Sequence, residues 1–134
     1  MLSPKRTKFR KYQKGRIGGI KPNTNQLPFG RYGIKTKDPG IIKAKTIEAV
    51  RRVMTRKFKR TGQIWIRIFP DHPVTAKPAE VRMGKGKGNL SYWASKVQSG
   101  QILYEIDGVT LQTAQQAALL AYHKLPVKTV FIER

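Results

Sequence analysis

The sequence contains no cysteine among its 134 residues. Disulfides, thiolate nucleophiles and cysteine-ligated zinc are therefore excluded. Acidic residues are scarce as well, with 7 Asp and Glu against 28 Lys and Arg, which gives a formal net charge of +21. No apolar run approaches the roughly 20 residues that a membrane-spanning helix needs, and the first residues have no apolar signal core. We therefore expect neither membrane insertion nor secretion.

The positive charge is concentrated at the start of the chain. Residues 1–60 hold 19 Lys and Arg and 2 acids, whereas residues 61–134 hold 9 Lys and Arg and 5 acids. A partner rich in negative charge would offset the resulting self-repulsion, and nucleic acid is the densest such partner. We expect the first part to face RNA and the second part, which is richer in Ile, Val, Leu and Trp, to build the core.

Residues 1–28 are predicted to form a basic, extended arm without a core of its own, and residues 29–134 a single domain. Glycine and proline interrupt the arm repeatedly, and its apolar residues follow no period. We expect RNA phosphates to order it. Its candidate RNA-binding residues are Lys5, Arg6, Lys8, Arg10, Lys11, Lys14, Arg16 and Lys21.

Residues 42–60 are predicted to form a helix. At about 100° per residue, Ile47, Val50, Met54 and Phe58 share one stripe, which is typical of a buried face. Basic residues gather on the opposite side, which is either an RNA-binding face or an ordinary solvated surface. The RNA-binding candidates on this helix are Arg51, Arg52, Arg56, Lys59 and Arg60.

The remaining elements are five strands and a second helix. Residues 63–69 alternate strictly in polarity, and residues 29–37, 92–98, 102–106 and 127–132 also read as strands. Ser99 and Gly100 are spaced for a hairpin turn between two of them. Residues 111–125 form the second helix, with Thr110 as its N-cap. The fold class predicted is α+β, with two helices packed on a mixed or antiparallel sheet.

The predicted core combines residues from both helices and from the strand at 63–69. In the second helix, Leu111, Ala114, Ala118 and Tyr122 share one stripe. The residues expected to be mostly buried are Ile47, Val50, Met54, Ile64, Ile66, Leu111, Ala114 and Ala118.

A long loop is predicted at residues 70–90, and loops of this length are usually functional or disordered. Its centre is Arg82, Met83, Gly84, Lys85, Gly86, Lys87 and Gly88, in which glycine allows close backbone approach and lysine adds charge. A nucleotide-phosphate loop needs four residues between its glycines and then Lys followed by Ser or Thr, and this spacing is missing. A flexible surface tip is the alternative to insertion into RNA.

No constellation of residues indicates catalysis, a metal site or a cofactor. His72 and His123 are far apart in the sequence, and among the acids only Glu105 and Asp107 are close together. Most aromatic residues fall in strand patterns and are expected in the core. Tyr12 lies in the basic arm and is the best candidate for stacking on a base.

Several motifs together resemble the bacterial-type ribosomal protein L-sixteen family. In the first half, the resemblance is carried by Met1 to Lys11, Gly15-Arg16, Phe29-Gly30, Ile47-Glu48-Ala49, Arg51-Arg52 and Met54-Thr55-Arg56. In the second half it is carried by residues 64–71, Lys77-Pro78, Arg82 to Gly88, Tyr92-Trp93, Leu103-Tyr104-Glu105 and Gly108-Val109. The resemblance covers essentially the whole chain.

The resemblance implies a non-enzymatic, structural constituent of the large ribosomal subunit. Its implied partners are large-subunit rRNA, the aminoacyl-site tRNA and neighbouring ribosomal proteins, and no membrane. The family's long loop reaches toward the peptidyl-transferase centre, so residues 82–88 are expected near the tRNA, and the family joins the subunit late in assembly. The rivals are a free RNA chaperone or histone-like binder, and a small enzyme with a phosphate-binding loop.

Two segments depart from common bacterial members. Lys43 stands where members often have Thr or Ser before the first helix, and losing that cap should cost about 1 kcal/mol. Residues 18–27, with Gly62-Gln63-Ile64 and Gly100-Gln101-Ile102, are more similar to organelle-encoded forms, especially mitochondrial ones. We expect a mitochondrial ribosome, with a plastid or a bacterial cytoplasm as alternatives.

Overall fold

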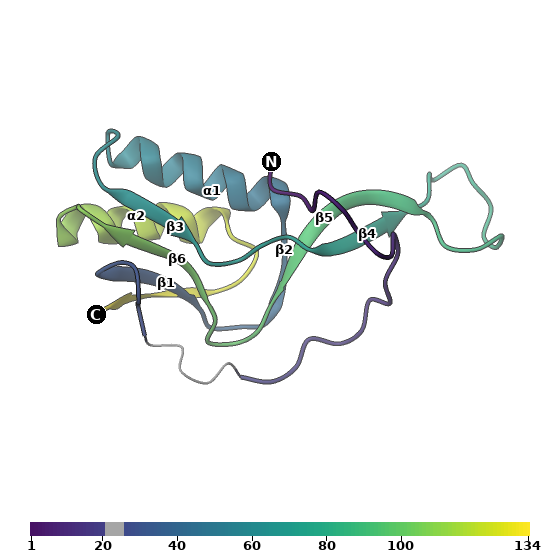
Figure 1. Cartoon of the computed structure of the whole chain (residues 1–134), viewed down its shortest axis with the longest axis horizontal. Coiled ribbons are helices and arrows are strands. Elements are labelled where there is room, and N and C mark those ends of the chain that lie inside the picture. Colours follow the sequence, from purple (N-terminus) through teal and green to yellow (C-terminus); the bar gives the residue numbers. More distant parts are fainter. Residues whose placement is uncertain (21–25) are drawn as a thin grey trace.

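The computed structural model describes residues 1–20 and 26–134. Within these residues the chain forms seven strands and two helices (Figure 1). In chain order they are β1 (Tyr32–Thr36), β2 (Gly40–Lys43), α1 (Ala44–Lys57), β3 (Gln63–Ile66), β4 (His72–Ala76), β5 (Asn89–Val97), β6 (Ile102–Asp107), α2 (Leu111–Lys124) and β7 (Thr129–Glu133). The predicted α+β fold class is confirmed.

A four-stranded antiparallel sheet and the two helices form the main body. The strand order is β3-β6-β1-β7, and α1 and α2 lie together along one side of this sheet (Figure 1). The stripe of Ile47, Val50, Met54 and Phe58 is buried in the core, as predicted. The buried Tyr104 of β6 donates a hydrogen bond of 3.0 Å from its hydroxyl to the carbonyl of Ile47, which links α1 to the sheet.

A second sheet projects from this body. Its order is β2-β5-β4, also antiparallel, and β4 and β5 continue beyond β2 as a two-stranded hairpin. Residues 72–76, which the sequence analysis placed in the long loop, form β4, so the loop itself spans residues 77–88. In Figure 1 this loop is the part of the molecule farthest from the helices.

The first helix is shorter than predicted. Ile42 and Lys43 belong to β2, because Ile42 is buried in the second sheet opposite Ser95. The helix ends at Lys57, before the predicted stop at Gly62, and Lys59 and Arg60 adopt left-handed backbone angles with φ of 51° and 68°. Lys43 precedes the helix with no side-chain cap, as expected from its chemistry.

Part of the predicted second-helix stripe is wrong. Leu111 and Tyr122 are about two-fifths exposed, whereas the buried residues are Ala114, Ala117, Ala118 and Ala121. Small side chains therefore face α1 and the sheet, and the larger apolar ones remain outside. Thr110 does cap this helix, accepting a hydrogen bond of 3.4 Å from the backbone N–H of Thr113.

The strand predictions need two corrections. β3 ends at Ile66 rather than Phe69, and because it is an edge strand, Ile64 and Ile66 are only partly buried against the core. The predicted hairpin at Ser99-Gly100 is also wrong, since β5 and β6 belong to different sheets. The turn instead pairs with the end of β1, where Thr36 exchanges backbone hydrogen bonds of 2.9 Å with Gly100 and Gln101.

Candidate nucleic-acid interface

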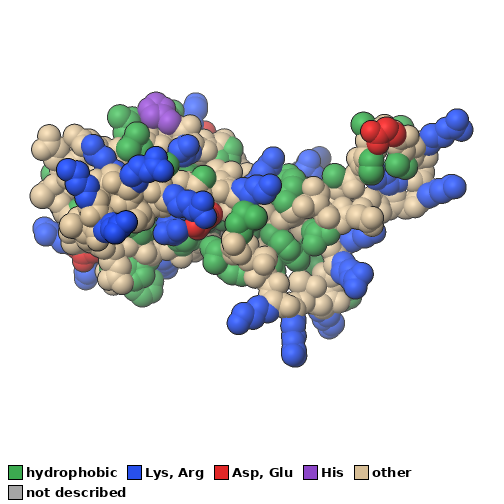
Figure 2. Space-filling view, turned by 90° about the horizontal axis from the view of Figure 1, so that it is seen from above, with side chains coloured by type: hydrophobic (Ala, Val, Ile, Leu, Met, Phe, Trp, Pro, Cys, Tyr) green, Lys and Arg blue, Asp and Glu red, His purple; other side chains and the backbone are tan. Residues whose placement is uncertain are grey.

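The exposed face of α1 is strongly basic. Arg52, Arg56, Lys59 and Arg60 are exposed, and Arg51 is half-buried beside them. Figure 2 shows Lys and Arg side chains gathered over this side of the body and again at the far end of the hairpin. These five residues line one depression, and their contact with RNA stays a prediction.

Glu48 orders two of these cations. Its carboxylate accepts hydrogen bonds of 2.6 Å from Arg51 and 3.1 Å from Arg52. The hydrogen bond from Arg51 is the main reason that the pKa of Glu48 falls from its ordinary 4.5 to about 2, and Arg52 adds to the effect against the cost of burial. Glu48 therefore stays ionised at neutral pH and fixes both guanidinium groups while cancelling one charge.

The end of α1 forms a shallow basic depression. It is lined by Arg51, Arg52, Thr55, Arg56, Lys59 and Arg60. Lys59 and Arg60, which have left-handed backbone angles just after the helix, complete the lining. Several cations around one depression, with a threonine hydroxyl among them, suit the oxygens of an RNA phosphate.

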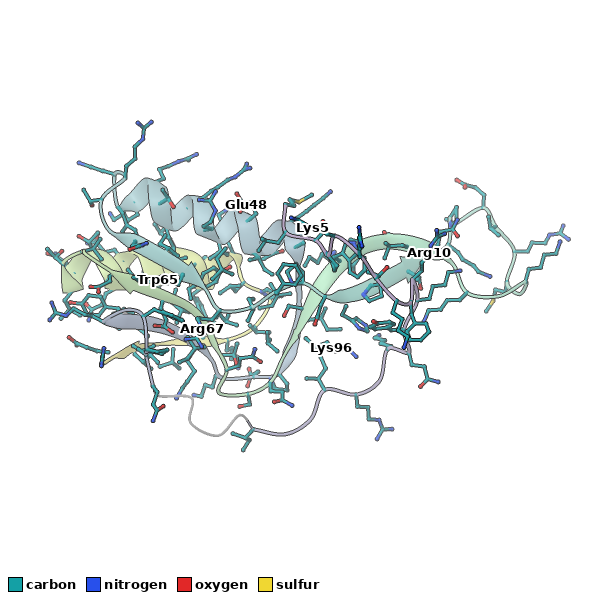
Figure 3. The ribbon with its side chains drawn as sticks, viewed as in Figure 1. Lys5, Arg10, Glu48, Trp65, Arg67 and Lys96 are labelled. Atoms are coloured by element: carbon teal, nitrogen blue, oxygen red, sulfur yellow. The ribbon has the colours of Figure 1, made fainter. Side chains whose placement is uncertain are left out.

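The arm runs in an extended path along the second sheet. Residues 1–20 contain no helix or strand, and the arm's basic residues from Lys5 to Arg16 are all exposed. Lys21 lies outside the described residues. Figure 3 shows Lys5 and Arg10 on the arm near the hairpin, with Lys96 reaching toward the arm from β5.

Three side chains at or just beyond the ends of β5 hold the arm by its backbone. Lys87 donates to the carbonyl of Tyr12, Lys96 to that of Lys14, and Gln98 to that of Gly18, the last at 2.9 Å. In return Lys11 donates to the carbonyl of Lys87 at 3.0 Å. The arm and the base of the loop therefore meet, a juxtaposition that sequence spacing alone does not reveal.

The loop at residues 77–88 is exposed along nearly its whole length. Met83 is 99% exposed, and no atom lies within 4 Å of where a Cβ would stand on Gly84 or Gly86. Both glycines have positive φ, and Lys77 donates a hydrogen bond to the carbonyl of Gly84. The tip is therefore free of the body, with Arg82 and Lys85 exposed upon it.

Gly88 and Lys87 differ from the rest of the loop. A Cβ on Gly88 would stand 2.5 Å from the carbonyl oxygen of Ala76, so this glycine is needed where the hairpin closes. Lys87 contacts the arm, as described above. Of the seven loop residues predicted to approach RNA, these two have a structural task as well.

A buried carboxylate whose role was not predicted from the sequence fixes the start of the domain. Glu105 is fully buried and accepts hydrogen bonds from the backbone N–H groups of Phe29 at 2.8 Å and Gly30 at 2.9 Å. It also pairs with Arg67, whose guanidinium lies 4.9 Å from the ring of Phe29. Phe29 stacks in turn on Trp65, with ring centres 6.1 Å apart. Figure 3 shows Trp65 and Arg67 on this part of the sheet.

The two histidines occupy separate environments. His72 is buried at the start of β4, where burial and then the nearby Lys96 lower its pKa, Asp71 raises it in part, and Lys87 lowers it by a lesser amount. His123 is exposed in the last turn of α2. In residues 1–20 and 26–134 no group of three His, Asp or Glu side chains is placed to hold a metal ion. No helix in this described part is long and apolar enough to cross a bilayer.

Comparison with known proteins gives one consistent family. The profile of the family described as ribosomal protein L16p/L10e matches residues 4–132. The large ribosomal subunit protein uL16m of Prototheca wickerhamii is 61% identical over 132 residues, which cover 98% of both chains. The uL16 proteins of Gluconobacter oxydans and Xanthobacter autotrophicus are 58% and 56% identical over 134 residues, covering all of this chain and 97% and 98% of theirs.

Proposed function

The chain belongs to the ribosomal protein L16p/L10e family, and from this premise we propose that it braces large-subunit rRNA through three basic surfaces and presents its loop to the aminoacyl-site tRNA. The family consists of structural constituents of the large subunit. The three surfaces are the α1 face, the arm and the loop. The observation that carries the proposal is that the arm and the loop, both basic, are joined to one another on the same hairpin.

The charge distribution supports rRNA as the main partner. The exposed cations of the arm and of α1 have few carboxylates beside them, and Glu48, the acid on α1, cancels one charge while it positions Arg51 and Arg52. Phosphate contacts of this kind supply affinity and fix orientation without reading sequence. Sequence-independent bracing of folded rRNA is therefore the role that these surfaces suit.

The position and composition of the loop support the proposed contact with the aminoacyl-site tRNA. It lies at the end of a hairpin and far from the helices, so it can extend into RNA without disturbing the core. Gly84 and Gly86 present bare backbone between cations, which permits close approach to a phosphate chain. We propose that the tip made by residues 82–86 lies beside the tRNA acceptor end near the peptidyl-transferase centre.

We further propose that the chain serves a mitochondrial ribosome. The support is the 61% identity to uL16m of Prototheca wickerhamii, together with the residues at 18–27 that resemble organelle-encoded forms. A free RNA chaperone would share the charge, but it would have no reason to match this family from residue 4 to residue 132.

Charge-neutral variants test the rRNA-binding surfaces. Replacing Arg56 and Lys59 with Gln removes one exposed cation of α1 and one just after its end. The matched control replaces the exposed Lys124 and Lys128, at the end of α2 and before β7. The plot of log affinity for large-subunit rRNA against log salt concentration should flatten by up to about 0.7–0.9 per lost contact in the α1 variant. The same change in both variants would contradict a defined α1 surface.

A further inference from the structure

A pocket lies between the arm and the second sheet. It encloses about 420 Å³, within the range of roughly 300–1,000 Å³ typical of small-molecule sites. Tyr12 contributes one wall from the arm, while His72 and Tyr92 contribute others from β4 and β5. Because Tyr12 belongs to the arm, the pocket is complete only while the arm is docked.

Two of the aromatic side chains of this pocket, Tyr12 and Tyr92, keep exposed surface. The rings of Tyr12 and His72 are 6.1 Å apart and tilted by 59°, so they do not cover one another by parallel stacking. Tyr12 is 41% exposed although its backbone is held in place, and Tyr92 is partly exposed. Fixed aromatic rings with an open face are the usual platforms for unstacked bases.

The charged side chains of the pocket are all cationic. Lys14, Lys43 and Lys87 line it, and no carboxylate does. Lys43 is 4.9 Å from the centre of the Tyr92 ring. Lys87 uses one of its N–H donors on the carbonyl of Tyr12, which leaves two for a ligand. An aromatic wall beside several ammonium groups matches a base joined to a phosphate.

We propose that this pocket binds a single unstacked nucleotide of RNA, with its base on Tyr12 and Tyr92 and its phosphate near Lys14, Lys43 and Lys87. We take large-subunit rRNA as the source of this nucleotide, and that part of the proposal rests on the proposed function. In this proposal the arm first docks on the second sheet through its contacts with the protein, and the nucleotide then binds against the docked arm. The α1 face and the loop tip, by contrast, offer cations without aromatic walls.

The first test uses the free, full-length chain and adenosine 5′-monophosphate as the probe. The ring signals of Tyr12, His72 and Tyr92 are followed by NMR, and the exposed Tyr122–His123 pair on α2, with rings 5.7 Å apart, is the internal control. We expect saturable shifts in the pocket only. Ribose 5-phosphate, which lacks a base, should bind at least about fivefold more weakly, as the loss of one base–aromatic stack requires. Equal binding of the two probes would mean an anion site only and would overturn the proposal, as would an absence of saturation.

Side-chain variants give the second test. Tyr12→Leu removes the ring and leaves both the charge and the backbone carbonyl that binds Lys87, so it should weaken adenosine monophosphate binding about 5- to 150-fold. Tyr12→Phe keeps the ring and should bind normally, as should Tyr122→Leu, whose tyrosine is equally exposed at 41%. Equal affinity of Tyr12→Leu and Tyr122→Leu would overturn the proposal.

An experiment on assembled subunits distinguishes a failure of the nucleotide site from a failure of the proposed function. In large subunits that carry Tyr12→Leu, one rRNA base should gain reactivity toward base-modifying reagents, and subunits that carry Tyr122→Leu should match the wild type. If the wild-type chain does not enter the subunit, the proposed function fails whatever the nucleotide titration gives. If the chain enters and both variants leave the reactivity pattern unchanged, only the nucleotide site is refuted.

Discussion

Replacing Glu105 with Ala should destabilise the domain by about 3–5 kcal/mol, the usual effect of removing one member of a buried ionic group. The fully buried carboxylate serves three donors, which are the backbone N–H groups of Phe29 and Gly30 and the guanidinium of Arg67. Each backbone donor left without an acceptor costs about 1–3 kcal/mol. Arg67 adds less, because its side chain is 33% exposed and water can replace the carboxylate.

Urea unfolding of the free, full-length chain measures this effect. Trp65 reports directly, because its ring stacks on Phe29, next to the lost contact. The transition midpoint should fall at an unchanged slope if only stability changes. Glu105→Gln retains one oxygen for the two backbone donors, but it places an amide NH2 group where Arg67 now finds a carboxylate oxygen, so its stability should fall between those of the wild type and Glu105→Ala.

Glu133→Ala is the control, because Glu133 is an exposed acid of the edge strand β7. Its free energy of unfolding should lie within about 0.5 kcal/mol of the wild type. A loss below about 1 kcal/mol for Glu105→Ala would refute the reasoning, because a typical single hydrogen bond contributes that much. It would mean that Phe29 and Gly30 find other acceptors and that Glu105 does not fix the start of the domain.

Three further outcomes follow from the same geometry. Replacing Arg82 and Lys85 with Ala should leave urea unfolding unchanged, because both are exposed on the loop tip, while subunits carrying the change should bind aminoacyl-site tRNA more weakly at normal protein occupancy. Lys43→Ser should stabilise the domain by up to about 1 kcal/mol by capping α1, less any loss of the Lys43–Tyr92 contact, as measured by thermal unfolding. Because pairing lowers the pKa of Glu48 from 4.5 to about 2, its stabilisation is complete above about pH 4.5 and is lost as the pH falls toward 2. Glu48→Gln should remove that part of the acid sensitivity, and an unchanged acid profile would show that the pair contributes nothing.

The periodic parts of the fold could be predicted from the sequence. The α1 stripe buries large apolar residues at helical spacing, and the helix was predicted with only small errors at its ends. The short strand at residues 102–106 was also predicted, although all five of its residues are buried in succession. The stripe of α2 was partly misplaced, because its buried face consists of alanines, which give a weak pattern beside the more conspicuous but exposed Leu111. β2 and β4 were missed because each is short and has proline or glycine in or beside it.

The candidate interface was predictable in composition but not in arrangement. Clusters of Lys and Arg, together with the Gly and Pro pattern and the helical spacing, indicated the arm, the α1 face and the loop as candidates. The contacts between Lys87 and Tyr12 and between Lys96 and Lys14 join residues more than 70 positions apart, so no local pattern could reveal them. The role of Glu105 was hidden for the same reason, since two of its partners are backbone groups that any residue would supply.

The sedimentation of the tagged chain in lysate from its native cell or organelle tests the central claim most directly. Phosphate contacts alone weaken steeply as salt rises, whereas an interface that also uses the docked arm, the loop and the folded body should persist. The chain is predicted to co-sediment with large subunits and whole ribosomes after a high-salt wash, and to be absent from free small subunits. Recovery in the light, ribosome-free fractions after the same wash would contradict the account.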